Sequence, residues 1–340
     1  MSTTLNQINI PKGRMKEVLH HLFMKHGFSF TKAKILAETF TESSLVGVNS
    51  HGINRVPLFI DYINKGIVLA EMEAEVLQVF GSMERWDGKL GSGIINAHIC
   101  TDRAIKLAKE DGMGLVALGN TNHWMRGGTY GMKAAKAGCI GIMFTNTQPN
   151  MPPWGGIESR IGNNPLVISV PRANGSVVLD MALSQFSFGK IHSYFLKDEK
   201  LPFHGGFDAQ GKLSDDPASI LEKERGLPIG YWKGSGLSMV LDMLATILSM
   251  GQSTFRIGQE NIETGISQVF LCINPGIWGK EDLQARILEE IIDYTRTAGL
   301  VDENARIFYP GEQSTATRNQ NVVQGIPVDK NIWEQVVDLA

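Results

Sequence analysis

The chain has 340 residues, of which 43% are hydrophobic and 20% charged, a composition typical of a globular protein with one large domain or two unequal ones. Its 32 lysines and arginines against 35 acidic residues give a net charge of −3, which excludes the basic field that a nucleic acid or an anionic membrane would need. Three irregularly spaced cysteines, no apolar signal core and no apolar run near the roughly 18 residues of a membrane span predict a cytoplasmic protein without a membrane anchor.

The first 70 residues have a helical pattern. Apolar residues recur at helical spacing from Met15 to Phe23, Gly27 can end that helix, and a second stripe runs over residues 33–44. From about residue 76, short apolar runs alternate with helical stretches. The strand candidates are residues 114–118, 140–145, 166–170, 177–181 and 268–273.

Four further helices are expected between and after these strands. They cover residues 94–109, residues 130–137, residues 237–250 and a last stretch marked by Leu283, Ile287, Ile291 and Ala298. The segment 237–250 is apolar on nearly all sides, which predicts a buried helix. The alternation of strands and helices indicates an α/β or α+β fold.

A glycine-rich dinucleotide fingerprint is absent from the sequence. No G-x-G-x-x-G pattern occurs, and the glycine clusters at 88–93 and 234–236 have the wrong spacing. The absence argues against a Rossmann fold, although it does not exclude a bound dinucleotide.

The stretch Ser-His-Gly-Ile-Asn-Arg at 50–55 is the first that contains candidate catalytic residues. His51 and Arg55 are four residues apart, so they share a face on a helix or helical turn. A histidine can protonate the alkoxide that forms when hydride reaches a ketone, and an arginine can bind a carboxylate through two hydrogen bonds. From the spacing alone, a surface turn with a capping serine and an ion-paired arginine is the simpler interpretation.

A second stretch, residues 120–128, follows a predicted strand and repeats the combination with His123 and Arg126, while Trp124 can wall a pocket. A strand-to-helix loop whose polar residues only cap the next helix explains it equally well.

Two later stretches have the residues of a nucleotide site. Asp180 ends a predicted strand, where it can bind ribose hydroxyls, orient a histidine or merely cap a helix. Lys233 opens the apolar helix, so the helix N-terminus and the lysine together suit a pyrophosphate. The alternative is a glycine-rich helix entry with a lysine that extends to solvent. Ahead of both stretches, the prolines, tryptophan and Gly-Asn-Asn-Pro turn of residues 151–166 predict a rigid wall or turn.

Together these motifs resemble the type 2 malate/L-lactate dehydrogenases over nearly the whole chain. The resemblance is carried by Ser-His-Gly-x-x-Arg at 50–55, the Asn-His loop, Arg-Ile-Gly-x-Asn-Pro at 160–165, Asp-Met-Ala at 180–182 and Pro-Gly-Glu at 310–312. It implies a non-Rossmann fold and a homodimer. It also implies a helical domain of residues 1–75, completed by about 305–340, and an α/β cofactor-binding domain of residues 76–304.

The resemblance also implies roles for individual residues. His51 would be the proton donor, with Arg55 and His123 as the other catalytic residues, and Ser50, Arg55 and Arg126 would bind the substrate. The expected cofactor is NAD(H) rather than NADP(H), with no metal. Its predicted contacts are Ser176, Val177, Val178, Leu179, Asp180, Met181, Ala182, Trp232, Lys233, Gly311, Glu312 and Gln313.

The expected reaction is reversible hydride transfer at C2 of a 2-keto or 2-hydroxy acid, with a 2,3-diketo sugar acid as the substrate. Oxidation of malate, L-lactate, sulfolactate or ureidoglycolate is the alternative within the family. A non-redox sugar-acid lyase or isomerase is the alternative from another class. A metal-dependent form of the latter needs a cluster of carboxylates and histidines, and the sequence pattern indicates none.

Overall fold

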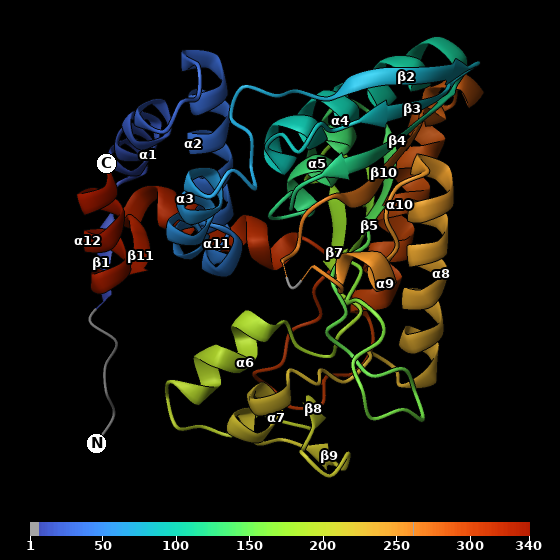
Figure 1. Cartoon of the computed structure of the whole chain (residues 1–340). Helices are drawn as coiled ribbons and strands as arrows, with labels where there is room; N and C mark the ends of the chain where they lie inside the picture. Colours follow the sequence, from blue (N-terminus) through green and yellow to red (C-terminus); the bar gives the residue numbers. More distant parts are fainter. Residues whose placement is uncertain (1–6, 261) are drawn as a thin grey trace.

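The structure is a computed structural model that describes residues 7–260 and 262–340 (Figure 1). The strands are β1 (Gln7–Ile10), β2 (Glu75–Phe80), β3 (Met83–Asp87), β4 (Met113–Thr121), β5 (Ile140–Thr145), β6 (Leu166–Val170), β7 (Val177–Met181), β8 (Gly206–Phe207), β9 (Leu213–Ser214), β10 (Ile266–Ile273) and β11 (Ile326–Asp329). The helices are α1 (Lys12–Lys25), α2 (Phe30–Leu45), α3 (Val56–Asn64), α4 (Gly93–Asp111), α5 (Gly128–Lys136), α6 (Phe188–Phe195), α7 (Pro217–Lys223), α8 (Trp232–Ser249), α9 (Thr254–Ile257), α10 (Glu281–Arg296), α11 (Glu312–Gln324) and α12 (Lys330–Leu339).

A seven-stranded mixed sheet forms the centre of the molecule, in the order β2-β3-β4-β10-β5-β6-β7. Only β3 and β4 pair in parallel, and the other neighbours are antiparallel. A Rossmann fold needs consecutive parallel strands joined by helical crossovers. The predicted mixed α/β class without a Rossmann fold is therefore confirmed, and the topology explains the missing glycine fingerprint.

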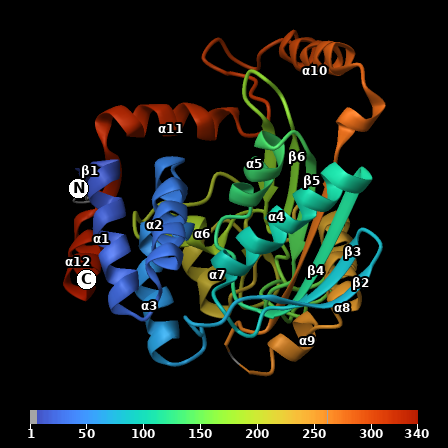
Figure 2. The ribbon, with the colours of Figure 1, turned by 90° about the horizontal axis from the view of Figure 1, so that it is seen from above.

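Helices cover both faces of this sheet. Side chains alternate along a strand, so Val116 and Leu118 of β4 pack with α4 and α5, while Ala117 packs with α8. Figure 2 shows α4 and α5 on one side of the sheet and α8 on the other. This two-sided covering explains why the strand candidates at 140–145, 166–170 and 177–181 are nearly continuous apolar runs.

The first and last parts of the chain share a second core. The strand β1 pairs with β11. Phe23, Phe40 and Phe59 of the N-terminal helices, and Phe28 between α1 and α2, pack beside residues of β11 and α12. Figure 1 shows α1 to α3 and α12 together beside the sheet. We propose the two domains at the predicted bounds, although residues 1–6 lie outside the described part of the chain.

The prediction that residues 237–250 form a buried helix is half wrong. The helix α8 exists, and Leu241 and Ala245 pack on the sheet. Its other face is exposed, with Leu237, Met239, Val240, Met243, Leu244 and Ile247 all at least 37% accessible. A sheet covers only one side of a helix, and no described element of this chain covers the other side of α8.

The pattern at residues 283–298 was also only partly correct. The helix α10 ends at Arg296, so Ala298 lies beyond it, and its marker residues Leu283, Ile287 and Ile291 are exposed rather than buried. The sequence pattern missed β2 because all six of its residues are exposed and show no alternation. None of the described helices is both long and apolar enough to cross a membrane.

Candidate active site

The Ser-His-Gly stretch forms two successive 3₁₀ turns, η1 (Asn49–His51) and η2 (Ile53–Arg55), rather than one α-helix. The Ser44 hydroxyl accepts the Ile53 amide at 2.9 Å and holds the turns against α2. Gly52 is required here because any Cβ would collide with Ser44. The start of α6 approaches from the other side, where a Cβ on Gly189 would lie 3.0 Å from the Ser50 Cβ.

The fold brings together the two histidines that the sequence separates. The rings of His51 and His123 stack with centroids 5.6 Å apart. The Ser50 hydroxyl lies 3.0 Å from Nδ1 of His51, and within the described part of the chain Nε2 of His51 has no hydrogen-bond partner. That free nitrogen is the atom available for proton exchange with a substrate.

Charge and burial keep both rings neutral at pH 7. Burial and then Arg55 lower the pKa of His51 to about 4, partly offset by Asp180. Burial, Arg55 and His51 itself hold the pKa of His123 well below its usual value. In the absence of a substrate, His51 is therefore a base, and it needs an incoming negative charge near Arg55 to gain a proton.

Arg126 and Asp180 connect this pair to the central sheet. The Asp180 carboxylate accepts the Gly128 amide at 2.8 Å and lies 3.7 Å from Nε of Arg126. A Cβ on Gly128 would sit 2.7 Å from that carboxylate, so the glycine permits the contact. Both charges act on the pKa of His51, which places the end of β7 beside the histidines.

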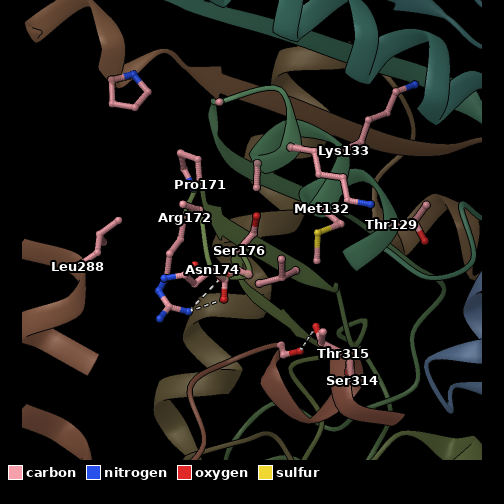
Figure 3. A pocket seen from close by; sticks show the side chains of 18 of the residues that line it. Thr129, Met132, Lys133, Pro171, Arg172, Asn174, Ser176, Leu288, Ser314 and Thr315 are labelled. Atoms are coloured by element: carbon pink, nitrogen blue, oxygen red, sulfur yellow. Dashed lines mark hydrogen bonds between the residues drawn. The ribbon is translucent and has the colours of Figure 1, made fainter. Parts of the chain in front are cut away.

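A cavity of about 1110 Å³ opens next to Arg126 (Figure 3). Of the predicted cofactor contacts, Ser176, Val178 and Gly311 line it. The Pro310 carbonyl accepts the Val178 amide at 2.9 Å, so the Pro-Gly-Glu turn adds to the edge of β7. The remaining predicted contacts Val177, Leu179, Asp180 and Met181 lie on β7, Ala182 follows it, and Glu312 and Gln313 begin α11.

The cavity fits a dinucleotide. Its volume is slightly above the range of about 300–1,000 Å³ that is typical of small-molecule sites, which leaves room for a ligand as large as a dinucleotide. The Thr129 hydroxyl is buried without a hydrogen-bond partner in the described structure and lines the cavity. The charged lining residues are the cations Arg126, Lys133, Lys136, Arg172 and Arg318 and the anions Glu42, Glu281 and Glu289. Arg172 pairs with Glu289 and Arg318 with Glu42, so Arg126, Lys133 and Lys136 are the cations that suit a pyrophosphate.

Trp232 and Lys233 do not belong to this cavity within one chain. They begin α8, on the opposite face of the sheet from α5. Trp232 is 64% exposed, and the Lys233 ammonium lies only over the Trp232 ring, at 6.0 Å. Trp124 was expected to wall a pocket, but it is buried in the core against Phe270.

Sequence reasoning missed Glu263, Thr129 and Arg172. Glu263 is a lone carboxylate in a loop, and nothing in its neighbourhood in the sequence signals that it lies 3.9 Å from His123. Thr129 directly follows the candidate stretch 120–128, so its place next to that stretch was the signal that could have identified it. Among residues 7–260 and 262–340, no three histidine, cysteine or acidic side chains gather in a way that could hold a metal ion.

Comparison with known proteins identifies the family of the chain. The family model described as malate/L-lactate dehydrogenase matches residues 10–337. The 2,3-diketo-L-gulonate reductases of Citrobacter koseri and Klebsiella pneumoniae are each 41% identical to the chain over 324 residues, which is 95% of this chain and 97% of theirs.

Solved structures share the fold. The malate dehydrogenase from Pyrococcus horikoshii OT3 is 27% identical with a TM-score of 0.90, over 100% of this chain and 96% of that one. The sulfolactate dehydrogenase from Methanocaldococcus jannaschii is 30% identical with a TM-score of 0.88, over 98% and 96%. The chain belongs to the malate/L-lactate dehydrogenase family and is a pyridine-nucleotide-dependent oxidoreductase of hydroxy and keto acids.

Proposed function

We propose that the chain catalyses the NADH-dependent reduction of 2,3-diketo-L-gulonate to 3-keto-L-gulonate. The observation that carries this proposal is the free Nε2 of His51, on a ring whose pKa both Arg55 and Arg126 lower, with Arg126 also lining a cavity of dinucleotide size. The name of the substrate comes from the relatives that are 41% identical over nearly the whole chain.

In this reaction the bound cofactor supplies a hydride to C2 of the keto acid. The residues of the chain bind the substrate and supply the proton. Arg55 binds the carboxylate, and that negative charge offsets the effect of Arg55 on His51. His51 then gains a proton from solvent and donates it from Nε2 to the C2 oxygen, so the ketone becomes a secondary alcohol. Arg126 and His123 line the site and limit water around the new hydroxyl.

The direct test is an assay of NADH oxidation with a panel of keto acids. The panel comprises 2,3-diketo-L-gulonate, oxaloacetate, pyruvate and sulfopyruvate, each with NADH and with NADPH. We expect the highest kcat/KM for 2,3-diketo-L-gulonate with NADH. A higher value for oxaloacetate or sulfopyruvate would instead assign the chain the reaction of its structural neighbours. No oxidation with any keto acid would contradict the proposal.

The preference for NADH is supported by the wall of the cavity that α10 forms. Glu281 lines this wall, and its carboxylate repels the extra phosphate of NADPH. The guanidinium of Arg172 is not free to bind that phosphate, because Nε and Nη2 each donate to Glu289 at 2.7 Å.

We also propose that the protein works as a homodimer in the cytoplasm. The exposed apolar face of α8 is a patch that a second copy can bury by placing its own α8 against it. All three cysteines are buried free thiols, which fits a reducing compartment.

In a dimer, Trp232 and Lys233 can contact a cofactor that they do not reach within their own chain. Both residues begin the helix whose apolar face we assign to the interface, and neither lines the cavity of its own chain. We propose that they reach the cofactor of the other copy, where Lys233 adds a positive charge to the pyrophosphate.

A subunit-mixing experiment tests this placement. The Lys233→Ala protein should lose NADH affinity, measured by fluorescence titration, with little change in its thermal melt. When His51→Ala and Lys233→Ala chains are refolded together, about a quarter of wild-type activity should return, because half of the dimers carry one intact site. A mixture of His51→Ala and Arg55→Ala chains is the control and should stay inactive. No recovery in the first mixture would show that Lys233 does not act across the interface.

Arg55→Lys should raise the KM for the keto acid roughly tenfold to a hundredfold, because one ammonium cannot replace the two-pronged hydrogen bonding of a guanidinium. NADH affinity should not change. The matched control is Arg85→Lys on β3, where the half-buried arginine donates to Gln78. If KM and kcat of the Arg55→Lys variant equal the wild-type values, the substrate carboxylate does not bind Arg55.

A further inference from the structure

Glu263 is a buried carboxylate beside the histidine pair. It lies in the loop between α9 and β10, and its side chain is only 12% exposed. Its Oε2 accepts the Gln148 amide at 3.1 Å, and its Oε1 lies 3.9 Å from Nε2 of His123. The next residue, Thr264, donates to the Asn122 side chain at 3.0 Å, so the loop is tied to the stretch that carries His123.

The hydrogen bonds of His123 fix the position of its proton. The Met125 amide donates to Nδ1 at 2.9 Å, so Nδ1 carries no hydrogen. A neutral imidazole then has its hydrogen on Nε2, which is the nitrogen that faces Glu263. A cavity of about 20 Å³ that Arg55, His123 and Glu263 help to line leaves room for this contact to shorten.

A buried carboxylate is costly unless it has partners. Burial raises the pKa of Glu263, while the Gln148 amide and the charge of Arg55 lower it. The small cavity beside this side chain is lined in part by the apolar residues Leu58, Phe59 and Val68, which offer the carboxylate no partner. Its two oxygens instead face two N–H groups, one from the backbone and one from His123.

We propose that Glu263 is the positioning residue of the histidine pair, which holds His123 with its proton on Nε2 and its ring flat against His51. Because the only N–H of His123 points at Glu263, His123 does not protonate the substrate. It serves as a fixed neutral surface that orients His51. The catalytic consequence rests on the proposed keto acid reduction, whereas the position of the proton on His123 does not.

The Glu263→Gln variant removes the charge of this side chain and keeps its size and shape. Its single carbonyl oxygen can face either Gln148 or His123, and the NH₂ group must face the other N–H. The backbone amide cannot change, so the NH₂ group faces His123 and opposes a proton on Nε2. An alanine only removes the partner and leaves the Met125 amide to hold the ring. We therefore expect Glu263→Gln to be worse than Glu263→Ala, although glutamine is closer in size.

The kinetic readout is the order of kcat in the two variants, with Glu263→Gln below Glu263→Ala. In Glu263→Gln, kcat should fall roughly 10–10²-fold with the Kd for NADH unchanged. In Glu263→Ala the fall should be smaller. A residue that only fills space gives the opposite order, with the glutamine variant near wild type. That opposite order, or a wild-type kcat in the glutamine variant, would overturn the proposal.

The second readout needs no turnover. Nitrogen NMR of ¹⁵N-histidine protein reports which ring nitrogen is protonated, and comparison with His123→Asn assigns the signals. We expect His123 to be protonated on Nε2 in the wild type and to lose that state in Glu263→Gln. The matched control is Glu84→Gln, which removes the charge of a carboxylate that is 4% exposed and bound to Arg103. This control variant should have a lower Tm and unchanged His123 signals. Unchanged His123 signals in Glu263→Gln would overturn the proposal even if the substrate were a different one.

Discussion

The His51→Ala variant should lose about 10²–10⁴-fold in kcat for keto acid reduction, because the proton donor for the new hydroxyl is removed. The fold should be retained, since the only hydrogen bond of the His51 side chain in the described structure is with its neighbour Ser50. NADH affinity should also be retained, because His51 does not line the large cavity. Steady-state kinetics, an NADH titration and a thermal melt measure the three quantities.

Two comparisons make this result specific to His51. His21→Ala, on the exposed side of α1, should be equal to wild type in all three measurements. Added imidazole should restore part of the activity of His51→Ala, because it can occupy the space of the lost ring and carry the proton. If the folded His51→Ala protein turned over at the wild-type rate, another group would be the donor, and the stacked ring of His123 would be the first to test.

The protein should lose stability steeply as the pH falls from 6.5 toward 4. In the folded state the pKa of His51 is lowered to about 4 and that of His98 to about 3, mainly by burial, and the pKa of His123 lies well below its usual value. Unfolded histidines titrate near 6.5. Between these values the unfolded chain binds protons that the folded chain does not, so the free energy of unfolding rises with pH and levels off above 6.5.

The size of this effect follows from the number of histidines. Each contributes up to about 1.4 kcal/mol per pH unit, so the three together contribute roughly 4 kcal/mol per unit near pH 5. Urea unfolding at several pH values measures the slope. His98→Gln should remove about a third of it, since His98 is one of the three histidines and its side chain contacts Thr39, Lys133 and Tyr130 rather than the histidine pair. His21→Gln is the exposed control and should leave the slope unchanged. A flat profile between pH 4.5 and 6.5 would show that these rings accept protons in the folded state.

Much of the fold could be predicted from the order of apolar residues. The strands β5, β6 and β7 have the predicted bounds. In β5 and β6 a run that is buried on both faces is apolar throughout and ends where polar turn residues begin, whereas the edge strand β7 is partly exposed and contains Asp180. The helices α4 and α5 likewise agree with their patterns within a few residues. The strand β2 was not predictable in this way, since an exposed edge strand has no buried side to leave a pattern.

The sequence by itself determined the family and the kind of chemistry, through the resemblance of its motifs to known dehydrogenases. His51 with Arg55, and His123 with Arg126, are short motifs that suit a carboxylate substrate and a proton transfer, but their spacing alone fitted a surface turn or a capping loop as well. The motifs also indicated a dinucleotide without a Rossmann fold. All of these depend on residues within a few positions of each other, and such local patterns are visible in a sequence.

Only the tertiary structure decided how these residues act together. The stacking of His51 on His123, the lowered pKa values of both, and the contact with Glu263 depend on burial and on neighbours that come from separate segments. The exposed face of α8 likewise depends on what packs against the helix. An apolar stretch predicts a helix with a surface that becomes buried. Whether the same chain or a second copy buries that surface depends on where the other elements lie.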